Sequence, residues 1–208
     1  MKDVKVKILE KAKKLFTDRG VSNVSIREIS REVGISHSNL IYHFQDKNAL
    51  LTSLHQQILE SAIQLNKEIA TEKDTLKSLF TSTLKGFEII YDFRFFMIDF
   101  NLIMRENTEL HQQIKEIEKL RFMMYDEKIS KMIDENIIRK EAYEKEYDYL
   151  ITQVRIFSDY WVSSSQVYER NPELSVKKYA RFFLNQFYPY LTEKGRKSFD
   201  DLLSLFDL

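Results

Sequence analysis

The sequence predicts an all-α protein in which an N-terminal three-helix helix-turn-helix domain precedes a C-terminal helical bundle. Glycine and proline are scarce, at four and two residues in a chain of 208, while Lys, Glu, Leu, Ile and Phe are abundant. This composition is typical of a nearly all-helical chain. Apolar residues also recur every three or four positions along most of the sequence, which is the period of an α-helix. Sheets are therefore not expected.

The first helix is expected to end at Asp18-Arg19-Gly20, because glycine readily adopts the left-handed conformation that closes many helices. Its lysines are interpreted first as solvent-facing residues and second as supports near phosphate groups. Its apolar residues recur at spacings of three and four: Val4, Ile8, Ala12, Leu15 and Phe16.

A second helix is predicted to begin after Ser25, since Ser25-Ile-Arg-Glu28 reads as a capping box in which serine and glutamate satisfy each other's backbone amides. Gly34 then permits a tight turn, and Ser36 is placed to cap a third helix that runs to about His43. Helix, tight turn and short helix form the bare helix-turn-helix pattern, which alone gives many false matches.

The third helix has an apolar inner face of Leu40, Ile41 and Phe44, and its outer face is polar and aromatic. Hydroxyl, amide and imidazole groups of this kind can bond base edges or phosphate oxygens. The alternative is that these residues only cap or pack the helix. The outward residues are His37, Ser38, Asn39, Tyr42 and His43.

The N-terminal quarter is also the basic part of the chain. Residues 1–50 contain ten Lys and Arg against six Asp and Glu, whereas the remainder contains 22 against 26. An excess of this size fits a solvated surface and a nucleic-acid footprint about equally well. It supports DNA binding only together with the motif that it surrounds.

Residues 25–50 resemble the N-terminal signature of TetR/AcrR-type regulators. The similarity rests on Val33-Gly-Ile-Ser36, on Leu40-Ile-Tyr-His-Phe44, and on Lys47 and Leu50. Two residues depart from the pattern, because Ser38 stands where the family often has glycine and Ile41 where an aromatic residue is common. The similarity covers about a quarter of the chain.

This resemblance implies a double-stranded DNA partner and assigns roles to individual residues. Ser36, His37, Ser38 and Asn39 would lie at the major groove, while Tyr42 and Lys47 would hold phosphates. Arg27 is either a backbone contact or a surface arginine paired with a carboxylate. The full expected DNA-binding set is Ser25, Arg27, Ser36, His37, Ser38, Asn39, Tyr42, His43 and Lys47.

Asp46 is a good N-cap for a fourth helix reaching about Ala70, which would join the DNA-binding domain (1–48) to an effector-binding and dimerisation domain (49–208). Family resemblance implies that this helix transmits ligand-driven movement. Further helices are predicted over 75–92, 93–105, 109–136, 140–169, 174–192 and 195–206.

Aromatic residues concentrate in the second domain, where 22 of 27 lie between Phe80 and Tyr190. They indicate either core and interface packing or an apolar cavity for a small apolar or amphipathic effector. The candidate ligand contacts are Phe87, Tyr91, Phe96, Phe100, Phe157 and Trp161.

The last two long helices are expected to bury aromatic and apolar residues against a second copy. A single short recognition helix gives weak specificity, whereas a two-fold dimer reads two half-sites. The chain is therefore predicted to be a homodimer on a near-palindromic operator. The resemblance implies that this dimer is a ligand-responsive repressor, with an activator as the alternative. The expected interface residues are Tyr160, Trp161, Val167, Tyr168, Tyr179, Phe182, Phe183 and Phe187.

Other functions remain as alternatives, namely a helical interaction module or ligand carrier and, more distantly, an enzyme. Cysteine is absent, which excludes disulfides and thiolate chemistry, and the four histidines form no metal-binding pair. Ser163-Ser-Ser165 has no flanking elbow glycines, and widely separated glycines rule out the common nucleotide-binding loops. No cofactor, metal, secretory signal or membrane segment is expected, which fits a soluble cytoplasmic protein.

Overall fold

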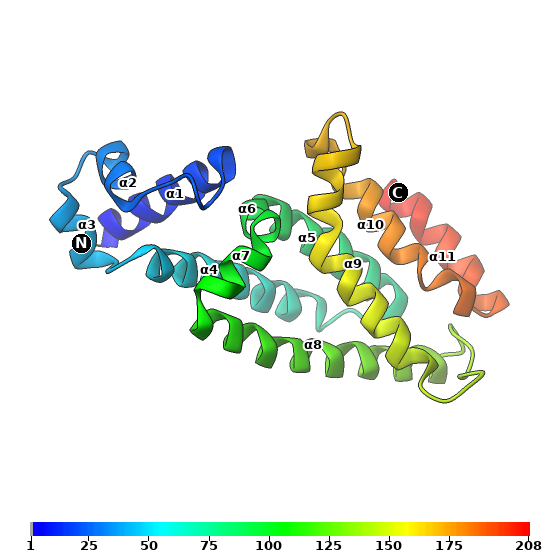
Figure 1. Cartoon of the computed structure of the whole chain (residues 1–208). Coiled ribbons are helices and arrows are strands. Elements are labelled where there is room, and N and C mark those ends of the chain that lie inside the picture. Colours follow the sequence, from blue (N-terminus) through cyan, green and yellow to red (C-terminus); the bar gives the residue numbers. More distant parts are fainter. Residues whose placement is uncertain (1) are drawn as a thin grey trace.

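The computed structural model describes residues 2–208, so Met1, the first residue of the expected DNA-binding domain, lies outside the described residues. Figure 1 shows α1 to α3 grouped as a head at one end and α9 to α11 at the other. The long helix α4 (Lys47–Ile69) leads from the head into the body and runs beside α8 (Thr108–Asp134). The all-helical fold predicted from composition and periodicity is confirmed for the described residues.

The head consists of α1 (Lys2–Arg19), α2 (Ile26–Val33) and α3 (His37–His43). The backbone amide of Glu28 donates to Ser25 Oγ at 3.2 Å, and that of Asn39 donates to Ser36 Oγ at 3.2 Å. Gly34 closes α2 at φ 79°, a conformation that costs glycine little. These local signals account for the predicted helix starts. The small core of the head comprises Ile8, Ala12, Phe16, Ile29 and Leu40.

One half of the predicted capping box is wrong. The Glu28 carboxylate turns away from the Ser25 amide and accepts a hydrogen bond from Arg19 Nη1 instead. Arg19 ends α1, so this charged contact ties the end of the first helix to the start of the second. An ion pair between α1 and α2 thus replaces the hydrogen bond from the Ser25 amide to Glu28 that a complete capping box would contain.

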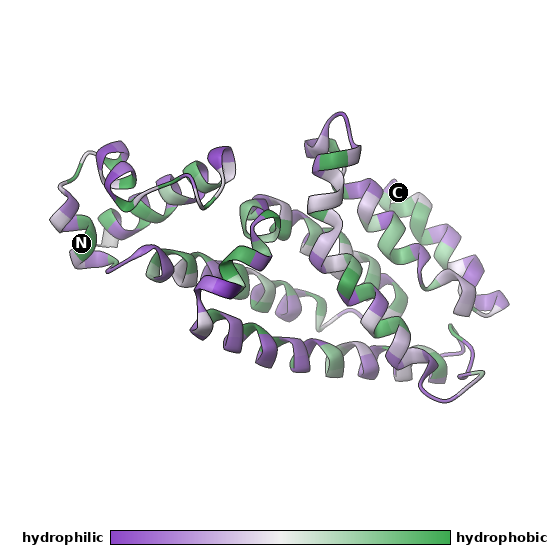
Figure 2. Ribbon diagram, viewed as in Figure 1, coloured by the Kyte–Doolittle hydropathy of each residue, from purple (hydrophilic) through white to green (hydrophobic). Residues whose placement is uncertain are grey.

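The body is built from α4, α5 (Thr75–Asp92), α8, α9 (Glu146–Tyr168), α10 (Val176–Asn185) and α11 (Glu193–Phe206). Asp46 Oδ1 accepts the Ala49 amide at 2.8 Å, which confirms the predicted cap of α4. Figure 2 shows hydrophilic colour on the outward faces of α8 and of the head helices. No helix within residues 2–208 is long and apolar enough to cross a membrane.

Three predicted helices are shorter or broken. The stretch 93–105 divides at Asp99 into α6 (Arg94–Ile98) and α7 (Phe100–Glu106). The helix predicted over 140–169 is α9, which begins only at Glu146. The stretch 174–192 becomes α10 followed by a 3-10 turn, Tyr188–Tyr190, that contains Pro189. Proline lacks the amide needed to continue an α-helix, which explains the last break.

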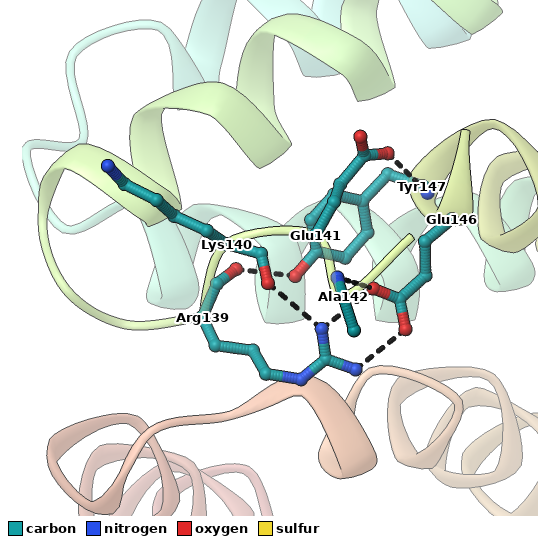
Figure 3. Close-up of polar contacts among 6 residues, drawn as sticks. All are labelled: Arg139, Lys140, Glu141, Ala142, Glu146 and Tyr147. Carbon is teal, nitrogen blue, oxygen red and sulfur yellow. Dashed lines mark hydrogen bonds and ion pairs between the residues drawn. The ribbon is translucent and has the colours of Figure 1, made fainter. Parts of the chain in front are cut away.

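The late start of α9 has a side-chain cause, shown in Figure 3. Arg139 Nη1 and Nη2 donate to the two carboxylate oxygens of Glu146 at 2.7 and 2.6 Å. The Ala142 amide donates to the same carboxylate at 2.7 Å, and Tyr147 Oη donates to the Arg139 carbonyl at 2.6 Å. These bonds hold residues 139–145 as a closed loop, with Lys145 at φ 64°.

The C-terminal helix α11 closes the far end of the body. A Cβ atom at Gly195 would lie 2.0 Å from the Ile137 carbonyl oxygen, so only glycine permits this approach. Phe199 then meets the Phe80 ring edge-on at 5.0 Å between centroids. Backbone bonds to the loop before α9 and an aromatic contact to α5 therefore hold α11 in place.

Candidate nucleic-acid interface and effector region

The outer face of α3 is exposed and rigidly held from beneath. Leu40 is fully buried and Phe44 nearly so, whereas Tyr42 is 74% exposed. Ser36, His37, Ser38 and Asn39 are all exposed at the start of the helix. The Ser36 and Ser38 hydroxyls lie 3.1 Å apart, and Tyr42 meets His43 edge-on at 5.2 Å. Ser36, His37, Ser38, Asn39 and Tyr42 are thus exposed together on α3 and its cap, whereas His43 is half-buried.

The remaining expected DNA contacts lie on α2 and α4 or their caps and differ in their exposure. Ser25 and Arg27 are exposed at the start of α2. Lys47, at the start of α4, is half-buried, and its ammonium donates to the Val21 carbonyl at 2.8 Å. An ammonium has three donors, so this contact leaves two for another acceptor. Lys47 therefore has a structural role within the head that the sequence did not reveal.

Lys5 is the lysine of the first helix, among those interpreted as possible supports near phosphate groups, that the structure places beside the end of α3. Its ammonium lies 6.0 Å from the centroid of the Phe44 ring, which ends α3. The side chain is exposed, so its charge reaches solvent beside α3. This position results from the tertiary packing of the head, and no local pattern distinguishes Lys5 from the other lysines of α1.

The six candidate ligand contacts separate into two groups. In the first, Phe87 stacks on Trp161 with centroids 4.8 Å apart, and Tyr91 and Phe157 lie at the edges of the same stack. In the second, Phe96 and Phe100 lie on either side of the α6–α7 break with centroids 6.3 Å apart. Because the two groups are separate, we expect one ligand to contact the first group rather than all six residues.

The first group contains an unsatisfied polar atom. Trp161 is 2% exposed, and its indole Nε1 is buried with no hydrogen-bond partner among the described residues. Such a donor costs free energy unless water or another molecule accepts from it. Burial also raises the pKa of the Tyr91 phenol above its usual range.

The second group lies against His55 of α4. The imidazole stacks on the Phe96 ring at 5.3 Å and 19°, and His55 is 6% exposed. Burial lowers the pKa of His55 to about 4, because the charged imidazolium would lose its hydration. The ring is therefore neutral at physiological pH.

Half of the expected dimer contacts are instead core residues. Trp161, Tyr179, Phe183 and Phe187 are each at most 6% exposed within a single chain, so they cannot also be buried against a partner. The other half remains exposed, with Tyr160 at 44%, Val167 at 72%, Tyr168 at 79% and Phe182 at 46%. Periodicity alone does not distinguish these two faces, because both repeat at helical spacing.

Two further exposed residues extend the outward face of α9. Tyr149 is 58% exposed and Ile156 is 50% exposed. Together with Tyr160 and Val167 they recur every four or seven residues, which places them on one side of the helix. We call these four residues, with Phe182 of α10, the apolar stripe. Within residues 2–208, no cluster of His, Cys, Asp or Glu is arranged to hold a metal ion.

Comparison with known proteins agrees with this architecture. The HTH-type transcriptional regulator YerO of Bacillus subtilis is 29% identical over 118 residues, which span 54% of this chain and 40% of that protein. A TetR-family transcriptional regulator from Marinobacter aquaeolei superposes with a TM-score of 0.82 at 21% identity, covering 97% of this chain and 98% of that one. A putative transcriptional regulator from Saccharomonospora viridis, crystallised in complex with choline, gives 0.73 at 19% identity, covering 93% and 100%.

Family models cover nearly the whole chain. Residues 8–54 match the model of bacterial regulatory proteins of the tetR family, and residues 54–199 match the model described as bacterial transcriptional repressor. The two matches meet within α4, the helix that links head to body. The chain belongs to the TetR family of bacterial regulatory proteins.

Proposed function

We propose that this protein is a cytoplasmic, sequence-specific transcriptional regulator that binds double-stranded DNA through residues 1–48 and dimerises through residues 49–208. The observation that carries the proposal is the exposed polar face of α3. It combines hydroxyl, amide and imidazole groups on a short helix whose opposite side carries the buried Leu40 and Phe44. A rigid helix with such a face suits insertion into the major groove.

The proposed contacts divide into base readers and phosphate holders. Ser36, His37, Ser38 and Asn39 would face base edges at the start of α3. Tyr42 and Lys47 would hold the DNA backbone, with Ser25, Arg27 and His43 beside them. About half or more of protein–DNA hydrogen bonds go to the sugar–phosphate backbone, so this division is the expected one.

A homodimer would place two heads on one operator. Two-fold related recognition helices read half-sites about 34–36 Å apart, which favours a near-palindromic sequence. The apolar stripe on α9 and α10 supports the dimer, because exposed apolar residues at helical spacing commonly mark an interface. Repression is proposed from the family, and effector binding would shift the dimer to a spacing that fits DNA poorly.

The proposed effector is a small apolar or amphipathic molecule bound at the first aromatic group. Support comes from the stacked rings of Phe87 and Trp161 and from the unsatisfied indole donor. The related S. viridis protein was crystallised with choline. A thermal-shift screen tests this proposal, since a molecule that binds only the folded state raises its apparent stability. Stabilising molecules that leave DNA affinity unchanged would argue against coupling.

Salt-dependent binding to the DNA upstream of the protein's own gene and its neighbours tests the main proposal. A specific fragment should bind with a steep negative dependence on salt concentration. Tyr42→Phe removes one hydroxyl from a 74% exposed side chain and should weaken binding by about tenfold. Tyr143→Phe is the matched control, since Tyr143 is exposed in the body. Equal, weak binding to all fragments by a folded dimer would contradict the proposal.

A further inference from the structure

The segment from Asp92 to Asp99 is a part of the body that packs against the head. Its short helix α6 packs against α1, as Figure 1 shows. Lys13 of α1 forms an ion pair with Asp92 and places its ammonium 4.0 Å from the centroid of the Phe93 ring. Phe16 of α1 contacts Phe95 with ring centroids 5.5 Å apart. Apolar and charged contacts together form this junction.

One residue of the head, Val21, is held through both its amide and its carbonyl at this junction. The Val21 amide donates to Asp99 Oδ2 at 2.7 Å, and the Val21 carbonyl accepts from Lys47 Nζ at 2.8 Å. Asp99 belongs to the body and Lys47 to the first turn of α4. Hydrogen bonds with a charged partner are about twice as strong as neutral ones. The backbone at Val21 is therefore fixed to two separate elements.

The helix break explains how Asp99 reaches this peptide. Asp99 lies between α6 and α7 at φ −96° and ψ 16°, outside both helices. Gly20 closes α1 at φ 79°, and a Cβ there would lie 3.5 Å from Asp99 Oδ2. The chain thus reverses after α1 directly against the carboxylate.

The same junction touches the other two helices that matter for DNA binding. Phe96 of α6 stacks on His55 of α4. Ser163 Oγ of α9 donates to the Met97 carbonyl at 3.4 Å, and Tyr160 Oη, on the apolar stripe, donates to Asn101 Oδ1 at 3.4 Å. The α6–α7 junction therefore lies between the head, the linking helix and the proposed dimer helix.

We propose that Asp99 is a positioning residue that fixes the angle between head and body, and through it the spacing of the two recognition helices. Its consequence for DNA rests on the proposed function, whereas its effect on Val21 does not. Without the carboxylate, the head would sample a range of angles. Only a fraction of dimers would then present both helices at the operator spacing, which lowers affinity by that fraction at each head.

Asp99→Ala tests this proposal with two readouts. Amide hydrogen exchange at Val21, measured by NMR, should accelerate by about tenfold or more, because the amide loses its acceptor. Specific DNA affinity should fall by about tenfold, while the slope of affinity against salt stays as in the wild type, since no phosphate contact is lost. Lys47→Ala, by contrast, should lower both affinity and slope.

Two further variants separate positioning from folding. Asp99→Asn keeps an oxygen acceptor for the Val21 amide and should recover most of the affinity. Asp126→Ala removes an exposed carboxylate from α8 and should change neither readout. A melting temperature near that of the wild type would show that Asp99→Ala is folded. If that variant is unfolded, the comparison of Asp99→Asn with the wild type carries the test, because a neutral acceptor makes the weaker hydrogen bond and should give faster Val21 exchange and weaker specific binding than the wild type.

Each outcome bears on a different statement. Unchanged Val21 exchange in Asp99→Ala would overturn the proposed hydrogen bond. Accelerated exchange with unchanged DNA affinity, or a reduced salt slope, would overturn the positioning role. Absence of specific DNA binding by the wild type would overturn the proposed function and with it the effect on spacing, and Val21 exchange would still decide whether Asp99 holds the head.

Discussion

His55 shows how burial of one residue makes stability depend on pH. Its pKa is about 4 in the folded protein and 6.5 when unperturbed. Between these two pH values, His55 binds a proton in the unfolded chain but not in the folded chain. The contribution of His55 to the free energy of unfolding is therefore fully present above pH 6.5. It is lost as the pH falls towards 4, and the loss is about 3 kcal/mol at most.

Replacement of His55 by phenylalanine should remove this dependence while keeping the stack on Phe96. Urea unfolding of wild type and His55→Phe at a fixed protein concentration, from pH 7 to pH 4, measures it. The wild type should lose more of its unfolding free energy than the variant does. His111→Gln is the control, because His111 is exposed. Parallel loss in wild type and His55→Phe would show that His55 is not buried as described.

At the scale of elements, the Arg139–Glu146 pair holds the loop before α9. The guanidinium and the Ala142 amide lower the pKa of Glu146 to about 2 from a usual 4.5. Glu146 therefore contributes stability above pH 4.5 that is lost as the pH falls towards 2. The carboxylate is 6% exposed, so removing the arginine leaves it with little compensation.

Arg139→Ala should raise the pKa of Glu146 back towards 4.5 and speed amide exchange in residues 139–145. An NMR titration of the Glu146 carboxyl carbon measures the first effect. The variant should also be less stable at neutral pH and lose less stability between pH 4.5 and 2. Lys140→Ala provides the control, since Lys140 contributes only its backbone carbonyl to this cluster. A pKa of Glu146 that stays near 2 in Arg139→Ala would contradict this account.

Helix starts set by neighbouring residues were predictable from the sequence. Helix starts and breaks that depend on contacts with residues distant in sequence were not. Ser25, Ser36 and Asp46 cap helices through amides three residues away, so their neighbours suffice to predict the helix starts. The break at Asp99 coincides with a bond to Val21, 78 positions earlier. The Arg139 amide likewise bonds the Tyr190 carbonyl, far along the chain. No local pattern encodes such partners.

The same distinction applies to the candidate sites. Periodicity correctly predicted that His37, Ser38, Asn39 and Tyr42 are exposed on α3, but it did not predict that Ile41 and His43 are half-buried. It could not assign Trp161 to the core and Tyr160 to the surface, since both belong to an aromatic run whose covering neighbours come from other helices. Side-chain exposure in the folded chain was needed to separate core from interface.

For the whole molecule, the apolar stripe predicts which surface a dimer would bury. Tyr149, Ile156, Tyr160 and Val167 line one side of α9, and Phe182 is exposed on α10. A charge in the middle of such a face would be buried without a partner in the dimer, at a cost large enough to separate the copies. The two heads would then bind DNA independently.

Ile156→Glu should therefore raise the dimer dissociation constant by at least about a hundredfold, as measured by light scattering or sedimentation. Leu120→Glu is the matched control, because Leu120 is 60% exposed on α8 rather than on α9. The monomeric variant should retain its helical content, since Ile156 is half-exposed within one chain. Its affinity for a two-half-site operator should fall steeply, while its affinity for a single half-site should match that of the wild-type head. A dimer that survives Ile156→Glu but not Leu120→Glu would move the interface from α9 to α8, and with it the expected spacing of the heads.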